Sequence, residues 1–239
     1  MSATMHLPKP NMVLIPAGPF LMGQGPAAHP LYLPTFLLAR YLVTNAQYQC
    51  FIKSGGYEAP RYWAEAGWAW LRREGVQEPE GWNELASRQE HPVVGVSWYE
   101  AMAFARWAGA HLPTEAEWER AARGEEGWVY PWGDEPDPSR CNTRESGLQG
   151  TTPVEYYSPL GDSPYGLADM VGNVWEWCSG LLRPYPYQAD DGREDPEAKG
   201  YRVLRGGSYL TPISVADCTV RSWLAPYEQA DNVGFRLAG

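Results

Sequence analysis

The sequence has few positive charges and no long apolar run. Its 239 residues include only three lysines, Lys9, Lys53 and Lys199, and the formal net charge is −10. Binding to a nucleic-acid backbone depends on clustered Lys and Arg, so this composition argues against a nucleic-acid ligand. A membrane-spanning helix needs about 20 consecutive apolar residues, and no segment approaches that length. We therefore expect no nucleic-acid partner and no membrane span.

Cysteine and targeting signals are also scarce. The four cysteines, Cys50, Cys141, Cys178 and Cys218, show neither C-x-x-C nor zinc-ligand spacing. We expect buried free thiols, although a Cys178–Cys218 bridge stays open. The segment Met1 to Asn11 has no apolar stretch typical of a secretory signal. The location therefore stays open: we expect cytoplasmic synthesis, and display on a cell or virion surface would need another route.

Tryptophan, glycine and proline are abundant instead. The chain has 12 Trp, 25 Gly and 22 Pro, and its composition does not change sharply along its length. This length suits one large domain, so we predict a single domain over residues 1–239. Long irregular segments leave backbone amides that need partners, and large aromatic side chains are one way to brace them. We interpret most of the tryptophans as bracing for a loop-rich fold.

The local patterns predict an α+β protein with few, short elements. Capping boxes at Ser97-Trp98-Tyr99-Glu100 and Thr114-Glu115-Ala116-Glu117 predict helices to about Ala108 and Gly124. Thr44 is a third predicted N-cap, for a helix from Asn45 to Lys53. The predicted strands are Met12 to Gly18, Phe36 to Tyr41, Val174 to Cys178, Tyr201 to Arg205 and Val233 to Leu237. Residues 60–89 lack a clear period, and we predict an irregular insertion with one helical turn near residues 64–73.

Several long motifs occur in one order along the chain. They are His91-Pro92-Val93-Val94-Gly95-Val96-Ser97-Trp98, Leu112-Pro113-Thr114-Glu115-Ala116-Glu117-Trp118-Glu119, Tyr130-Pro131-Trp132-Gly133, Gly166 to Trp177, Arg202-Val203-Leu204-Arg205-Gly206-Gly207-Ser208-Tyr209, and Asn232 to Leu237. Together they resemble the formylglycine-generating enzyme (sulfatase-modifying factor) family, over nearly the whole chain from Met12 to Leu237. The resemblance implies the variant of the C-type lectin fold found in that family.

The same resemblance raises the question of catalysis. The family's formylglycine chemistry uses two cysteines shortly after the Gly-Gly-Ser segment, which bind copper and engage the substrate thiol. Those positions are Thr211 and Ala216 here, and neither carries sulfur. A thiolate is the nucleophile and the soft-metal ligand, and Thr does not replace it. We therefore expect no copper and predict that the protein is not an enzyme.

A related branch of the family contains iron-dependent sulfoxide synthases. Their histidine-rich iron site comes mostly from an extra helical domain. Here His6, His29, His91 and His111 are dispersed, so we expect no iron and exclude this branch. The alternative function is a metal-dependent enzyme of this superfamily with other catalytic residues, with Cys218 as the sulfur near the site.

The resemblance also implies calcium sites. One would use the side chains of Asp169 and Glu176 with the carbonyls of Gly172 and Val174, and oxygen ligands of this kind suit Ca²⁺. A second would use Asn142, with carbonyls at Thr143 and Leu148, but its carboxylate position is Ser146 here. The alternative is that Glu176 caps a turn or pairs with an arginine.

The C-terminal segment, residues 202–237, is the candidate recognition region. It resembles the variable proteins of diversity-generating retroelements, which diversify surface residues on a lectin-type scaffold. We predict a binding surface for a protein or other macromolecular ligand, with Trp223 and Tyr227 exposed. Its residues are Tyr209, Leu210, Thr211, Ile213, Ser214, Val220, Ser222, Trp223, Leu224, Tyr227 and Glu228. We expect Val215, Ala216, Cys218 and Val233 to pack inward. A structural subunit of a larger assembly is a third possibility.

Overall fold

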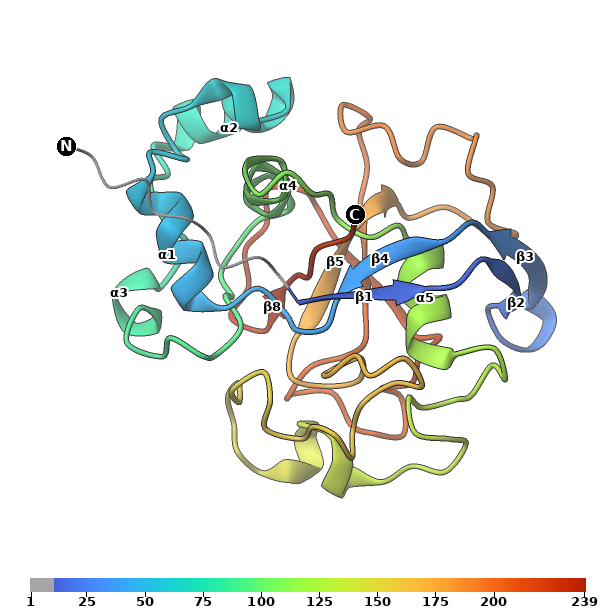
Figure 1. Ribbon diagram of the computed structural model, residues 1–239. Coiled ribbons are helices and arrows are strands. Elements are labelled where there is room, and N and C mark those ends of the chain that lie inside the picture. The colour runs from blue at the N-terminus through green and yellow to red at the C-terminus, as the bar shows by residue number, and fades with distance from the viewer. Residues whose placement is uncertain (1–10) are drawn as a thin grey trace.

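The computed structural model describes residues 11–239 and has the expected α+β composition (Figure 1). The prediction about a signal in Met1 to Asn11 lies outside the described residues, except at Asn11. The helices are α1 Asn45–Lys53, α2 Glu65–Glu74, α3 Trp82–Leu85, α4 Trp98–Trp107 and α5 Glu115–Arg123. The strands are β1 Met12–Ile15, β2 Gly18–Met22, β3 His29–Leu33, β4 Phe36–Ala39, β5 Trp175–Leu181, β6 Arg202–Arg205, β7 Arg221–Leu224 and β8 Val233–Gly234. Four short 3₁₀ turns lie at Gly25–Ala27, Pro60–Tyr62, Pro138–Arg140 and Arg144–Ser146.

The main sheet has four strands in the order β7-β6-β5-β8. The β5–β6 and β6–β7 pairs are antiparallel, whereas β8 runs parallel to β5 and pairs Glu176 with Gly234. Two further antiparallel pairs are β1–β4 and β2–β3, and β2 and β3 lie on the side of the molecule away from α1, α2 and α3 (Figure 1). The two ends of the chain meet, because Leu38 of β4 forms a β-bridge with Ala238. His111, from the middle of the chain, forms a second bridge with Ala238.

The three predicted helix starts are confirmed. Thr44, Ser97 and Thr114 each accept a hydrogen bond from the backbone of the residue three positions on, and each receives the reciprocal bond that completes a capping box. Helix α1 has the predicted bounds. These starts could be read from the sequence because a capping box satisfies orphan amides with side chains only three residues apart.

The prediction for residues 60–89 is wrong in part. Helix α2 runs for ten residues, and α3 adds a short turn of helix at Trp82. Three tryptophans of this segment, Trp63, Trp70 and Trp82, are buried in the same apolar cluster as α1 and α4. The helical period was hard to read because α2 is short, contains Gly67 and has charges at both of its ends. Strands β2, β3 and β7 were also missed, and β8 is shorter than predicted.

The core consists of two large apolar clusters on the two faces of the main sheet. One gathers side chains of α1 and α4 with Trp177 and Phe235, and the other gathers Trp118 of α5 with Val203 and Cys218. All four cysteines are free thiols, as preferred in the prediction, and Cys141, Cys178 and Cys218 are buried, whereas Cys50 is only half-buried. Among the described helices, none is long and apolar enough to cross a membrane.

Candidate functional site

The loop after β6 brings together the two positions at which the family carries its thiols. Gly206 and Gly207 have φ of 92° and 78°, which favours glycine. A Cβ on Gly207 would lie 2.9 Å from the Cβ of Ala216 and 3.4 Å from the Cβ of Thr211. Residues 211 and 216 therefore face a common point beside Gly207, although they come from different parts of the loop.

A cluster of neutral polar groups surrounds this point. The backbone N–H of Ser208 donates to Thr211 Oγ1 at 3.0 Å, and the two hydroxyl oxygens lie 3.4 Å apart. Asn232 Nδ2 donates to Ser208 Oγ at 3.1 Å. We call Ser208, Thr211 and Asn232 the hydroxyl cluster. Ser208 is fully buried, whereas Thr211 and Asn232 are half-buried, so these two are the polar side chains of the cluster that a ligand could reach; the cluster carries no charge and no nucleophilic sulfur.

Cys218 does not supply the missing thiolate. Its side chain is fully buried, and burial raises the pKa of its thiol well above the usual value. A buried thiol with a raised pKa stays protonated and is inert at neutral pH. The structure therefore gives no support to Cys218 as a nucleophile.

The predicted binding residues divide into three groups by exposure. Leu210, Ser214, Trp223, Tyr227 and Glu228 are exposed, as expected for Trp223 and Tyr227. Thr211, Val220, Ser222 and Leu224 are half-buried. Tyr209 and Ile213 are buried, so the structure does not present them to a ligand. Ala216, Cys218 and Val233 pack inward as predicted, but Val215 is exposed, because the loop turns it away from the cluster that holds Ile213.

These residues rest on two different parts of the fold. The loop at Thr211 is held by the turn at Arg144–Ser146: Arg144 N–H donates to Thr211 O, and Ile213 N–H donates to Glu145 Oε2, both at 3.0 Å. At the other end, the carbonyl of Pro226 accepts from Tyr99 N–H at the start of α4. There a pocket of about 350 Å³ is lined by three tyrosines, Tyr99, Tyr201 and Tyr227.

A buried ion-pair network, which sequence reasoning missed, fixes this C-terminal loop. Arg205 of β6 contacts Glu119 at 2.5 Å and Glu115 at 3.2 Å, and all three side chains are essentially buried. Arg205 also donates to the carbonyls of Cys218 and Thr219, and Arg221 of β7 pairs with Glu115. Glutamates four residues apart on α5 were a signal that one helix face carries both charges.

The predicted metal residues fit a cation only in part. Asp169 is buried and forms no ion pair within residues 11–239, and burial raises the pKa of its carboxyl to about 7. Its φ of 57°, with 84° at Gly172 and 62° at Asn173, gives a tight turn whose Asn173 amide donates to Asp169 Oδ2. A buried carboxylate without a charged partner would be stabilised by a bound cation. Asp169 and the carbonyls of Gly172 and Val174 therefore remain a proposed Ca²⁺ site.

Glu176 and Asn142 do not fit the same role. The oxygens of Glu176 accept from Arg236 Nε at 2.6 Å and Nη2 at 2.7 Å, so the pairing with an arginine describes this residue. Asn142 Oδ1 accepts from the hydroxyl of Ser146 at 2.8 Å, and its Nδ2 donates to Gly150 O. Ser146, which stands at the family's carboxylate position, thus occupies the oxygen that a metal would need. Within residues 11–239, no three side chains of His, Cys, Asp or Glu gather closely enough to hold a metal ion.

Comparison with known proteins decides the family. The model of the sulfatase-modifying factor enzyme 1-like domain matches residues 1–239. The chain belongs to this family. It is 38% identical to the formylglycine-generating enzyme of Streptomyces coelicolor, over 95% of this chain and 88% of that protein. It is 35% identical to the hercynine oxygenase of Mycolicibacterium smegmatis, over 95% of this chain but only 60% of that relative.

Two predictions change with these findings. The prediction that the protein is not an enzyme is wrong, because relatives 35–38% identical over most of the chain are named as enzymes. The exclusion of the oxygenase branch was also wrong, because hercynine oxygenases are among these relatives. The fold prediction is confirmed: the chain has the C-type lectin-like fold, and Treponema denticola variable protein 1 superposes with a TM-score of 0.71. At 21% identity, over 95% of this chain and 94% of that one, the likeness shows the fold alone.

Proposed function

We propose that this chain is the substrate-binding domain of an oxygenase of the hercynine-oxygenase kind, and that it works without a thiol pair. The observation that carries the proposal is the chemistry beside Gly207. The side chains of residues 211 and 216 converge there, but they are a hydroxyl, which belongs to the hydroxyl cluster, and a methyl group. A site of this kind can orient a polar substrate by hydrogen bonds, but it does not supply the thiolates of formylglycine chemistry.

The partial coverage of the hercynine oxygenase leaves room for a separate metal-binding part in this proposal. The chain spans 60% of the Mycolicibacterium smegmatis hercynine oxygenase that it matches, so a large part of that relative has no counterpart in these residues. In this proposal, a redox metal takes its ligands from outside residues 11–239. The hydroxyl cluster and the exposed side chain of Leu210 beside it then form the substrate-facing wall.

Calorimetry with hercynine tests this proposal directly. Thr211→Trp would replace the hydroxyl of the cluster with a large ring, and we expect it to weaken hercynine binding at least tenfold. Ser214→Trp, on the exposed part of the same loop, is the matched control and should leave the affinity within about twofold. Absence of hercynine binding to the folded wild-type chain would refute the proposal. Conversion of a cysteine-containing peptide by the copper-loaded chain would favour the formylglycine reaction instead.

A second candidate function is binding of a macromolecular partner by the C-terminal segment. The observation that favours it is the exposure of three aromatic side chains, Tyr201, Trp223 and Tyr227, at 55%, 49% and 56%. Rigid aromatic rings bury a large area on binding at a small entropic cost. A near-identical DNA repeat beside a reverse-transcriptase gene, differing at adenines, would support diversification of this surface, and an intact locus without one would contradict it.

A further inference from the structure

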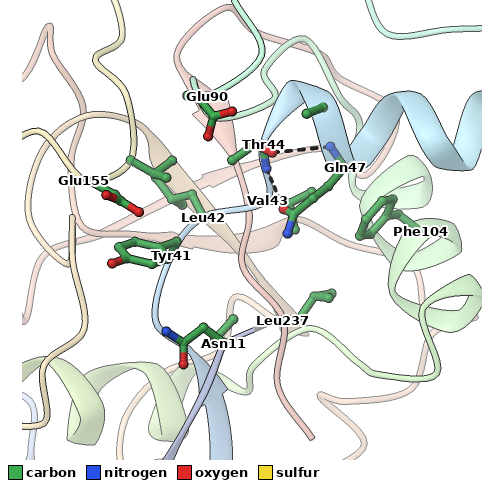
Figure 2. A pocket seen from close by; sticks show the side chains of 13 residues that line it. Asn11, Tyr41, Leu42, Val43, Thr44, Gln47, Glu90, Phe104, Glu155 and Leu237 are labelled. Carbon is green, nitrogen blue, oxygen red and sulfur yellow. Dashed lines mark hydrogen bonds between the residues drawn. The ribbon is translucent and has the colours of Figure 1, made fainter. Parts of the chain in front are cut away.

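A second pocket lies away from the hydroxyl cluster and takes no part in the function proposed above. It has a volume of about 260 Å³ and opens between the Tyr41–Thr44 segment, the first turn of α1 and residues 154–155 (Figure 2). This volume equals about nine water molecules at the density of the liquid. It therefore suits a small organic molecule of about nine non-hydrogen atoms.

The floor of the pocket is apolar and belongs to the core. Val43, Phe104 and Leu237 come from one core cluster, and Leu42 and Val154 come from another. The pocket thus lies where two packed clusters meet. An apolar floor of this kind favours an alkyl group over water.

The backbone around the pocket is held rigidly. The N–H of Val43 donates to Phe235 O, and the carbonyl of Val43 accepts from Val93 N–H, at 2.9 and 2.8 Å. Gln47 Oε1 accepts from Thr44 N–H at 2.9 Å, as part of the capping box that starts α1 (Figure 2). A pocket whose walls are fixed before binding loses little entropy when a ligand enters.

The rim of the pocket carries the negative charges of two carboxylates. Glu90 and Glu155 both line the pocket, both are exposed, and neither forms an ion pair within residues 11–239. The N–H of Val154 donates to Glu90 O at 3.1 Å, which ties the two segments together. The nearby guanidinium of Arg40 is already paired with Asp162 at 3.1 Å.

The aromatic ring of Tyr41 completes this rim. Burial raises the pKa of its hydroxyl, and the charge of Glu155 raises it further, although Arg40 opposes both effects. The guanidinium of Arg40 already lies over this ring, 5.2 Å from its centroid, so Tyr41 adds an aromatic wall beside Glu155 and leaves cation binding to the two carboxylates. An anion would be repelled at the same place, and a bare metal ion would find an apolar floor without ligands.

We propose that this pocket binds a small aliphatic organic cation, with its alkyl chain on the apolar floor and its ammonium or guanidinium head between Glu90 and Glu155. A charged hydrogen bond to a carboxylate is stronger than a neutral one, so the head group determines selectivity. The volume limits the chain length: a primary amine with about six carbons has about seven non-hydrogen atoms and fits within the space without protruding.

The test compares three probes of one length, n-hexylammonium, 1-hexanol and hexanoate, by titration calorimetry and by amide chemical shifts. We expect hexylammonium to bind at least tenfold more tightly than hexanol, and hexanoate not to bind. The largest changes in amide chemical shift on binding should occur at residues 41–47, 90 and 154–155. Equal affinities for the amine and the alcohol would overturn the proposal, because the carboxylates would then contribute nothing.

Three variants locate the site. Glu90→Gln and Glu155→Gln should each weaken hexylammonium binding several-fold, whereas Glu126→Gln, which removes an exposed carboxylate elsewhere, should not. Ala46→Leu fills the pocket from α1 with a good helix former and should abolish binding while retaining the circular dichroism spectrum. Equal loss in Glu126→Gln, or full binding in Ala46→Leu, would mean that the amine binds by net charge or at another place.

Discussion

Glu100 is a fully buried carboxylate that forms no ion pair within residues 11–239, and its titration should control how stability depends on pH. One oxygen accepts from Tyr57 Oη at 2.6 Å, and the other accepts from Ser97 N–H and Gln229 Nε2 at 2.8 and 2.9 Å. Burial raises the pKa of this carboxyl from 4.5 to about 7, although the hydrogen bonds oppose the rise. The loss of hydration therefore outweighs the donors that surround the charge.

The sign and size of the effect follow from this pKa. Since the folded state holds the proton more tightly than the unfolded state, the stabilising contribution is complete below pH 4.5 and is lost as pH rises through 7. A change from 4.5 to about 7 corresponds to ~3 kcal/mol of unfolding free energy. By pH 8 the ionised carboxylate should cost the protein about that amount.

The Glu100→Gln variant isolates this cost. The amide oxygen can accept from Ser97 and Gln229, and its NH₂ can donate to Tyr57, whose hydroxyl then donates to Tyr48 at 3.0 Å. We expect urea unfolding to show the variant gaining ~3 kcal/mol on the wild type between pH 4 and pH 8. Subtracting the two curves removes the contribution of other groups. A difference independent of pH, or one that moves the other way, would refute the reasoning.

Three further outcomes follow from the structure. Calcium added after chelation should raise the melting temperature of the wild type but not of Asp169→Ala; an equal rise in both would place the cation elsewhere. Arg205→Leu removes the fully buried guanidinium between Glu115 and Glu119, which keep only Arg221 and Arg123 as partners, and should cost about 3–5 kcal/mol in urea unfolding, against under about 1 kcal/mol for Arg73→Leu in an exposed pair. Trp177→Ala should cost about 3–5 kcal/mol, whereas Trp223→Ala, half-exposed at the sheet edge, should cost clearly less; equal costs would contradict its placement.

The proposed oxygenase role and the cation pocket stand on separate residues. The hydroxyl cluster lies beside Gly207, whereas the pocket is lined by Tyr41, Glu90 and Glu155. Thr211→Trp should therefore leave hexylammonium binding intact, and Ala46→Leu should leave hercynine binding intact. Failure of one proposal would not affect the other.

Local features of this protein were readable from the sequence. The capping boxes at Thr44, Ser97 and Thr114 predicted three helix starts correctly, because their bonds join residues three apart. The glycine pair at 206 and 207 is visible in the sequence, and the positive φ angles and the close contact with Ala216 show why both positions favour glycine. The order of the motifs indicated the family correctly, because each motif is a run of specific residues that needs no tertiary contact to be recognised.

The insertion at 60–89 shows where such reading stops. Its tryptophans had no explanation in the sequence, since the partners of Trp63 and Trp82 lie on α1 and α4 and on Tyr57. Helix α2 is stabilised by this packing more than by its own pattern of residues, so its length became visible only in the folded chain. The same limit applies to Tyr209 and Ile213, which were predicted on the binding surface but pack inward.

The sequence by itself determined the helix starts, the glycine turn, the absence of sulfur at positions 211 and 216, and the family. Each of these depends on residue identity or on bonds between near neighbours. Tertiary structure alone decided that Glu176 pairs with Arg236 and that Glu90 and Glu155 share one rim. Those pairings join residues up to 65 positions apart, and burial fixes which charges must find a partner.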